Sequence, residues 1–291
     1  MYEQSGGNKV TLVAHSMGGP VSLYFLNTNN EIVTQDWKDK HLHAYVTLSG
    51  AWAGAPIAVR EIVSGYNLGL LPDDVYDDFF RSFSRTQEST VWLFPDPGVF
   101  NSTIIVSTPN NNYTAKEYMT LFDHIKYPIG YSMYEGAGKI SKGFPAPKVD
   151  THCYWGLGIP TPLSLHYNKS FPVDGGYGPD PKKSVYSDGD GLVNNITSVH
   201  CLQWGADIIE YKTFEGVTHS NMTRNYTVFD AIAKVVTNVK AESKIRLKSS
   251  DDIHKDGMFH NIMPFRGFNT YTILSAIRKM MKKIVQMMVH I

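Results

Sequence analysis

Near its N-terminus the chain reads Lys9-Val10-Thr11-Leu12-Val13-Ala14-His15-Ser16-Met17-Gly18-Gly19. The apolar first part of this stretch predicts a buried strand, and apolar residues at helical spacing over residues 21–26 predict a helix. A serine at a sharp turn between such a strand and helix is typical of a nucleophile, because small flanking residues let the backbone fold back and expose the hydroxyl. The pattern is G-x-S-x-G with Ala14 in place of the first glycine. We therefore predict that Ser16 is a nucleophile.

Three further apolar runs have the length and composition of buried strands, at residues 43–50, 149–156 and 208–214. Helical spacing of apolar residues recurs over residues 225–240. Strands that alternate with helices indicate an α/β fold. We predict a mostly parallel sheet with helices on both faces.

The segments between these strands have weaker patterns. Residues 56–94 mix helical spacing with acidic and aromatic residues and predict a lid or cap insertion. Residues 101–143 are rich in turn formers, with a helix expected near residues 115–124. Residues 158–181 are rich in Pro and Gly and predict a loop.

The overall composition excludes several classes of protein. The chain has 27 Lys and Arg and 27 Asp and Glu in 291 residues, so it lacks the basic field that nucleic-acid binding requires. Hydrophobic residues make up 42% of the chain, which suffices for a buried core. The sequence has no apolar run long enough for a transmembrane helix. Two cysteines cannot form a cysteine-rich zinc module, and we expect no metal or cofactor.

A serine nucleophile needs a histidine base, and that base needs a carboxylate that orients it. In this type of fold the three follow one another in the order Ser, Asp, His. The acidic loop Ser187-Asp188-Gly189-Asp190-Gly191 offers the carboxylate, and we choose Asp190 with Asp188 as the close competitor. His219 follows the strand predicted at residues 208–214 and is the predicted base. We expect structural roles for three other histidines: His15, His152 and His200. His15 lies next to the nucleophile, and we expect it to point elsewhere on the turn.

The chain carries six N-x-S/T sequons, which favour a protein of the secretory pathway. The candidate glycosylation sites are Asn101, Asn112, Asn168, Asn195, Asn221 and Asn225. The first residues do not have the pattern of a signal peptide. We therefore expect that the chain begins within its fold and is a shortened form of a longer parent.

The end of the sequence differs from the rest, so we divide the chain into a partial α/β domain at residues 1–242 and a basic, Met-rich tail at residues 243–291. Apolar residues at helical spacing predict an amphipathic helix near residues 272–289. Such a helix can lie on a membrane surface. A packing helix or non-native translated sequence is the interpretation that we favour.

Several blocks in one order resemble the lecithin:cholesterol acyltransferase family of α/β hydrolases, most closely its lysosomal phospholipase A2 (group XV) branch. The resemblance covers about residues 8–240. It rests on the stretch around Ser16 and on Leu48-Ser49-Gly50-Ala51-Trp52-Ala53-Gly54, His152-Cys153-Tyr154-Trp155-Gly156-Leu157-Gly158-Ile159-Pro160 and Gly189-Asp190-Gly191-Leu192-Val193-Asn194.

The resemblance implies specific roles for individual residues. It places the family's triad on Ser16, Asp190 and His219, and so decides for the second aspartate of the acidic loop. It implies that the Met17 N–H is one oxyanion donor. It also implies a disulfide between Cys153 and Cys201, which suits a chain rich in sequons, and a lid loop over residues 64–90.

The activity implied by the resemblance is that of a phospholipase A and lipid O-acyltransferase, which moves an acyl chain from a glycerophospholipid to water or a lipid alcohol. The substrate would be met at a membrane or lipoprotein surface, in the lysosome or outside the cell. One alternative is a sterol or diacylglycerol acyltransferase of the same family. An alternative of another class is an inactive fragment or a non-catalytic lipid-binding remnant.

The chain also departs from the family. The family's N-terminal half, with its first strands and second oxyanion donor, has no counterpart in the sequence. One lost donor costs about 10²–10³ in rate. We therefore expect low stability and low activity from this chain relative to its longer parent.

Overall fold

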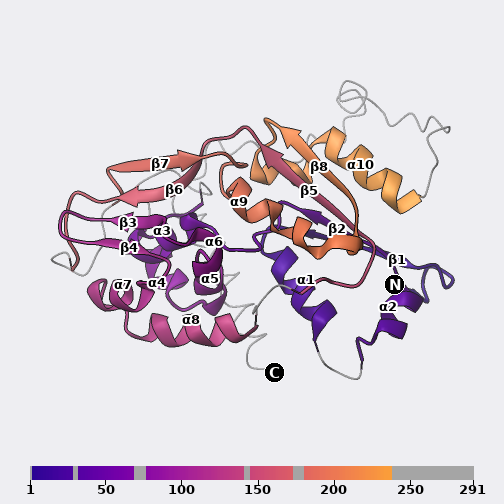
Figure 1. Ribbon diagram of the computed structural model, residues 1–291, viewed down its shortest axis with the longest axis horizontal. Helices are drawn as coiled ribbons and strands as arrows, with labels where there is room; N and C mark the ends of the chain where they lie inside the picture. The colour runs from indigo at the N-terminus through magenta and orange to yellow at the C-terminus, as the bar shows by residue number, and fades with distance from the viewer. Residues whose placement is uncertain (1, 29–31, 69–76, 141–144, 173–179, 238–291) are drawn as a thin grey trace, which may run out of the picture. The chain divides into compact units, whose positions relative to one another are not determined.

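The computed structural model describes residues 2–28, 32–68, 77–140, 145–172 and 180–237 (Figure 1). Contacts divide the chain into two units, Met1–Val239 and Lys240–Ile291. All of the described residues belong to the first unit. The predicted tail at residues 243–291, with its amphipathic helix near residues 272–289, lies outside the described residues.

The main sheet has four parallel strands in the order β1-β2-β5-β8. Their bounds are β1 Val10–His15, β2 Leu42–Leu48, β5 Thr151–Leu157 and β8 Ile208–Glu215. The chain passes between and after them through α1 Gly18–Asn27, α2 Gln35–His41, α9 Asn195–Ser198, η1 Val199–Asp207, η2 His219–Thr223 and α10 Tyr226–Thr237. These bounds confirm the strands and helices predicted from the apolar runs.

Helices cover both faces of this sheet. Successive residues of β2 point to opposite faces, so they pack against different helices. Tyr45 belongs to a cluster with Leu23 and Leu26 of α1. Its neighbours Ala44 and Val46 belong to a second cluster, with Val228, Ala231 and Val235 of α10. Figure 1 shows α1 and α10 on either side of the strands. The predicted α/β fold with a mostly parallel, doubly covered sheet is therefore confirmed.

The residues between β2 and β8 also build a second, mixed sheet in the order β4-β3-β6-β7. Its strands are β3 Ile104–Ser107, β4 Asn112–Thr114, β6 Thr161–His166 and β7 Lys183–Ser187. The accompanying helices are α3 Pro56–Ser64, α4 Asp77–Ser84, α5 Glu88–Trp92, α6 Pro97–Phe100, α7 Tyr118–His124 and α8 Ile129–Ile140. Figure 1 shows these elements grouped beside the main sheet, and we call them the cap. The cap has its own aromatic-rich core, which includes Phe94, Phe100, Tyr113, Tyr118 and Phe122.

The prediction of a loop over residues 158–181 is wrong, because β6 occupies Thr161–His166. This strand pairs with β3 in parallel and with β7 in the antiparallel sense. Its register against β7 shifts between Pro162 and Ser164. Proline is tolerated at such an irregularity, since it has no N–H to donate to a regular ladder. The helix expected near residues 115–124 is confirmed as α7.

Candidate active site

The candidate residues lie where the parallel strands of the main sheet end. Ser16 follows β1, and His219 opens η2 shortly after β8. Asp190 is bridged to Ile159, which follows β5. Loops that leave the carboxyl ends of parallel strands meet at the same edge of a sheet. The topology therefore brings residues that are far apart in the sequence to one edge.

Ser16 occupies a strained turn. Its φ of 57° lies in the left-handed region, which is unfavourable for a residue with a side chain. The backbone is held there by a hydrogen bond from the Ser16 N–H to the carbonyl of Leu48 at 3.0 Å. The Ser16 carbonyl in turn accepts from the N–H of Gly19 at 3.0 Å. A Cβ on Gly19 would stand 2.8 Å from the Trp52 ring, so only glycine lets the new helix α1 pack this closely.

Asp190 and His219 form a buried, hydrogen-bonded pair. The Nδ1 of His219 lies 2.7 Å from Oδ2 of Asp190, and the carboxylate is 1% exposed. The backbone N–H of His219 also donates to the Asp190 carbonyl at 2.8 Å. Because the carboxylate can only accept, Nδ1 carries the proton and the neutral imidazole presents a lone pair at Nε2. This tautomer is the one that a general base requires.

The surroundings keep the Asp190 carboxyl charged. Its Oδ1 accepts from the N–H groups of Leu192 at 3.1 Å and Val193 at 2.8 Å. Burial by itself would raise its pKa. The hydrogen bond and charge of His219, with the Val193 N–H and the Ser49 hydroxyl, bring this pKa below its ordinary value.

Strand β5 passes very close to the loops that carry Asp190 and His219, and this contact holds the pair in place. A Cβ on Gly156 in β5 would stand 2.2 Å from the Val217 carbonyl and 3.0 Å from Cβ of Asp190. The Gly156 N–H donates to the Ser49 hydroxyl at 3.3 Å. A glycine at this strand end is therefore needed for the loops that carry Asp190 and His219 to approach.

Sequence reasoning did not single out Ser49, which follows β2 and is fully buried. Its φ is 47°, so it is a second left-handed serine at the same sheet edge. Its hydroxyl accepts from Gly156 and interacts with the Asp190 carboxyl. The sequence signals were its position at the end of a predicted strand and its place in one of the blocks that carry the family resemblance.

The structure separates Asp188 from Asp190. Asp188 is exposed, and its Oδ1 accepts from the N–H of Gly158 at 2.8 Å. Within the described residues, Asp190 is the carboxylate that bonds His219. Among the residues that the structure describes, no hydrogen bond joins the Ser16 hydroxyl to His219. Such bonds are often long in a site without substrate and tighten when substrate binds.

Three histidines were expected to have structural roles. His152 lies 3.4 Å from the Glu210 carboxylate on β8. His200 contacts Gln203, with 3.2 Å between their ring and amide nitrogens. His15 was expected to point elsewhere on the turn than Ser16, and its ring centroid lies 4.5 Å from that of His219. The residue before the nucleophile therefore touches the candidate base.

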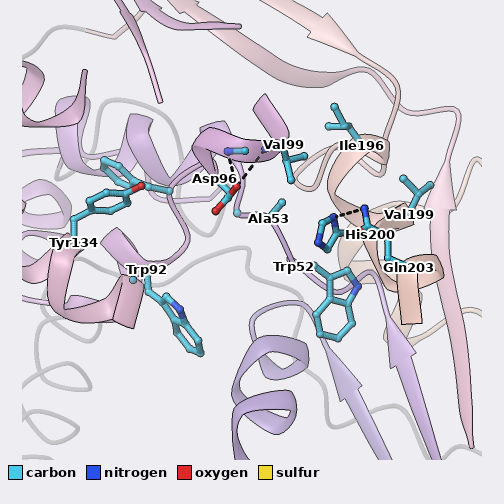
Figure 2. A pocket seen from close by; sticks show the side chains of 14 residues that line it. Trp52, Ala53, Trp92, Asp96, Val99, Tyr134, Ile196, Val199, His200 and Gln203 are labelled. Atoms are coloured by element: carbon cyan, nitrogen blue, oxygen red, sulfur yellow. Dashed lines mark hydrogen bonds between the residues drawn. The ribbon is translucent and has the colours of Figure 1, made fainter. Parts of the chain in front are cut away.

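A pocket of about 690 Å³ lies beside Trp52, whose ring packs against Gly19 of α1 (Figure 2). Ser16, Asp190 and His219 are not among the residues that line it. Figure 2 shows Trp92 and Tyr134 of the cap on one side, and Trp52 and His200 near the main sheet on the other. The Ala51 N–H, next to Trp52, donates to the Ser16 carbonyl at 3.4 Å. The lining includes four aromatic side chains, those of Trp52, Trp92, Phe94 and Tyr134, together with the aliphatic side chains of Val99, Ile196 and Val199. Such walls suit an apolar ligand.

A disulfide joins Cys153 in β5 to Cys201 in η1 across 48 residues of sequence. Both cysteines are buried in the hydrophobic cluster that also contains Trp52 and Trp204. The bond therefore ties the segment that carries His200, on the pocket wall, to the main sheet.

A parallel sheet with a strained serine after β1, and with an Asp–His pair on later loops, defines an α/β-hydrolase type of protein. The chain belongs to the lecithin:cholesterol acyltransferase family, whose model matches residues 1–239.

Individual relatives agree with this assignment. The chain is 35% identical over 240 residues to a Bos taurus protein named lysosomal phospholipase A and acyltransferase, a match that covers 81% of this chain and 56% of that protein. It is 32% identical over 219 residues to the Gallus gallus phosphatidylcholine-sterol acyltransferase, a match that covers 74% of this chain and 50% of the relative. The chain therefore spans about half the length of these relatives.

Among solved structures, the fold is similar to a chain in the crystal structure of the Tle4–Tli4 complex. The TM-score is 0.51 at 13% identity, and the match covers 82% of this chain and 62% of that chain. At this identity the likeness concerns the fold alone.

Proposed function

We propose that this chain carries the serine-dependent acyl-transfer site of a phospholipase A and lipid O-acyltransferase. One observation carries the proposal: the buried Asp190–His219 pair, 2.7 Å apart, lies at the sheet edge where Ser16 occupies its strained turn. The two relatives named above act, by their names, on phospholipids or phosphatidylcholine and transfer acyl groups.

In the proposed first half-reaction, Ser16 Oγ attacks the carbonyl carbon of a glycerophospholipid ester and His219 Nε2 takes the hydroxyl proton. Asp190 stabilises the resulting imidazolium. The Met17 N–H, at the start of α1, donates to the oxyanion, since the first N–H groups of a helix have no partner within it. The intermediate collapses, and His219 returns the proton to the departing lysophospholipid oxygen.

The second half-reaction uses the same groups on a new nucleophile. Water or a lipid alcohol gives its proton to His219 and attacks the acyl–Ser16 ester. The tetrahedral intermediate releases Ser16, which recovers a proton from His219. The aromatic pocket beside Trp52 would accept the acyl chain or the apolar body of the alcohol.

A sterol acyltransferase is the second candidate function, because the Gallus gallus relative is named for a sterol acceptor. The site would run the same chemistry with a sterol in place of water. The acceptor is therefore decided by the second half-reaction and must be measured by its products.

The test uses phosphatidylcholine vesicles that carry a labelled acyl chain, with and without cholesterol, and long incubations with the full chain. We expect labelled fatty acid and lysophosphatidylcholine, both lost in Ser16→Ala. Labelled cholesteryl ester in place of fatty acid would favour the sterol acyltransferase. Equal product from the wild type and Ser16→Ala would contradict the assignment of Ser16.

We also infer that the protein enters the secretory pathway and acts in the lysosome or outside the cell, an inference supported by the sequons and by the word lysosomal in the name of the Bos taurus relative. Four of the six sequon asparagines are exposed and offer glycosylation sites: Asn101, Asn112, Asn168 and Asn221. Asn195 is half-buried and accepts from the Trp155 ring N–H at 3.0 Å, and Asn225 bonds the N–H of Thr227 at 2.8 Å. Across the described ranges, none of the helices has the length and apolar character needed to cross a bilayer.

A further inference from the structure

His15 ends β1 and makes two contacts with the candidate base. Its Nε2 lies 3.0 Å from the backbone carbonyl of His219. Its ring lies 4.5 Å from the His219 ring, tilted by 40°. Because a carbonyl can only accept, the hydrogen bond assigns the proton of neutral His15 to Nε2. His15 is therefore hydrogen-bonded to the backbone of His219, whose side chain is hydrogen-bonded to Asp190.

The charge of His15 matters because its neighbour must become cationic during the proposed reaction. Burial lowers the pKa of His15, and the nearby His219 lowers it further. The hydrogen bond to the His219 carbonyl and the charge of Asp190 act in the opposite direction, and the net pKa lies below the ordinary 6.5. His219 and Asp190 are the ionisable groups that face His15. His15 is therefore uncharged at neutral pH.

We propose that His15 is a positioning residue for the reaction of Ser16: it fixes the His219 loop through the backbone carbonyl, and it must be uncharged when His219 takes the Ser16 proton. This inference rests on the proposed function. When Ser16 Oγ forms its bond to the acyl carbon, the hydroxyl proton moves to His219. A protonated His15 would place a second positive ring beside the new imidazolium and oppose the transfer.

The chain offers a matched control. His43, near the start of β2, also holds a backbone carbonyl through Nε2, that of Val235 at 3.1 Å. It lies in the same sheet as His15, at the other end of the neighbouring strand. His43→Ala therefore removes the same kind of contact as His15→Ala without touching His219.

The experiment measures the rate at which a fluorophosphonate probe labels the full chain at pH 8. We expect His15→Ala to slow labelling by about 10- to 100-fold, the scale of a small misplacement of a catalytic group. His15→Gln keeps a neutral donor of similar reach and should stay within about threefold of the wild type. His43→Ala, which removes a contact of the same kind far from His219, should also stay within about threefold. Thermal unfolding of each variant shows whether it is folded. A folded His15→Ala that labels at the wild-type rate would overturn the proposal.

The pH dependence separates positioning from a merely structural role. The ratio of wild-type to His15→Gln labelling rates should be constant above pH 6.5 and fall below it, as His15 gains its proton in the wild type alone. A ratio that stays constant down to the unfolding limit would show that the charge of His15 has no effect.

A second readout keeps this inference distinct from the proposed function. If the wild type is not labelled at all, the proposed function fails. The contact between His15 and His219 is then tested separately by the nitrogen-15 NMR signals of the imidazole rings. We expect His15 to show the Nε2–H tautomer, and we expect the His219 signals to move in His15→Ala but not in His43→Ala. Unmoved His219 signals in His15→Ala would overturn the positioning role.

Discussion

Replacing Asp190 by asparagine lowers the labelling rate of Ser16 by about 10⁴-fold, the scale expected when the base of such a triad is held in the wrong tautomer. The asparagine Oδ1 still accepts from the N–H groups of Leu192 and Val193, so the loop is kept. The amide NH₂ would face Nδ1 of His219, where the carboxylate now lies at 2.7 Å. Nδ1 must then accept, the proton moves to Nε2, and Nε2 loses the lone pair that a base needs.

Asp188→Asn is the matched control for this variant. Asp188 lies in the same acidic loop, and its Oδ1 accepts from Gly158, a bond that asparagine can also accept. We expect the labelling rate to stay within about threefold of the wild type, as for an exposed substitution away from the reacting groups. The assignment of Asp190 would be contradicted if Asp190→Asn stayed within tenfold of the wild type, or if Asp188→Asn caused the larger loss.

Removing the disulfide has the largest expected effect on stability. The bond between Cys153 and Cys201 closes a loop of 48 residues, and the chain-entropy relation gives about 4 kcal/mol for a loop of this length. The variant is Cys153→Ala with Cys201→Ala, which leaves no free thiol. We expect its free energy of unfolding, measured by urea titration, to fall by about 2–4 kcal/mol.

Reduction of the wild type provides the control for the alanine pair. A reductant should lower the wild-type free energy of unfolding by a similar amount and leave the double variant unchanged. A loss below about 1 kcal/mol in the double variant would mean that the cluster around Trp204 holds η1 without the bond. A further loss in the double variant on reduction would point to an effect of the reductant itself.

The main sheet could be predicted because its signals are local. The buried strands are continuous apolar runs, and the turn at Ser16 is specified by the small residues beside it. The choice of His219 rested on its place after a predicted strand, and the choice of Asp190 rested on its acidic loop, with the family resemblance deciding between Asp190 and Asp188. The hydrogen bond between them agrees with that choice at the level of geometry.

The cap sheet could not be predicted because its strands are short and gain their burial from distant partners. β7 has mostly exposed or half-buried residues, and β6 contains Pro162 at a register shift. Such segments have neither the alternation nor the apolar run that identifies a strand. β6 pairs with β3, which lies more than 50 residues earlier in the sequence, and such a long-range pairing is not encoded in local patterns.

The contacts of His15 and Ser49 were missed for a related reason. His15 lies 204 residues from His219 in the sequence, and with eleven histidines the pairing cannot be chosen from composition. Ser49 reaches the Asp190 loop through the strand order β2-β5, which places Gly156 beside it. Both contacts follow from topology, so they appear only when the strand order is known.

The central claim is that Ser16 is a nucleophile activated by His219 and Asp190. Its most direct measurement treats the full chain with a fluorophosphonate probe and locates the adduct by mass spectrometry, with Ser16→Ala in parallel. The account predicts one adduct, on the peptide that contains Ser16, which is absent from Ser16→Ala. A folded wild-type chain that carries no adduct, or carries it on another residue, would contradict the claim and leave a lipid-binding remnant as the better description.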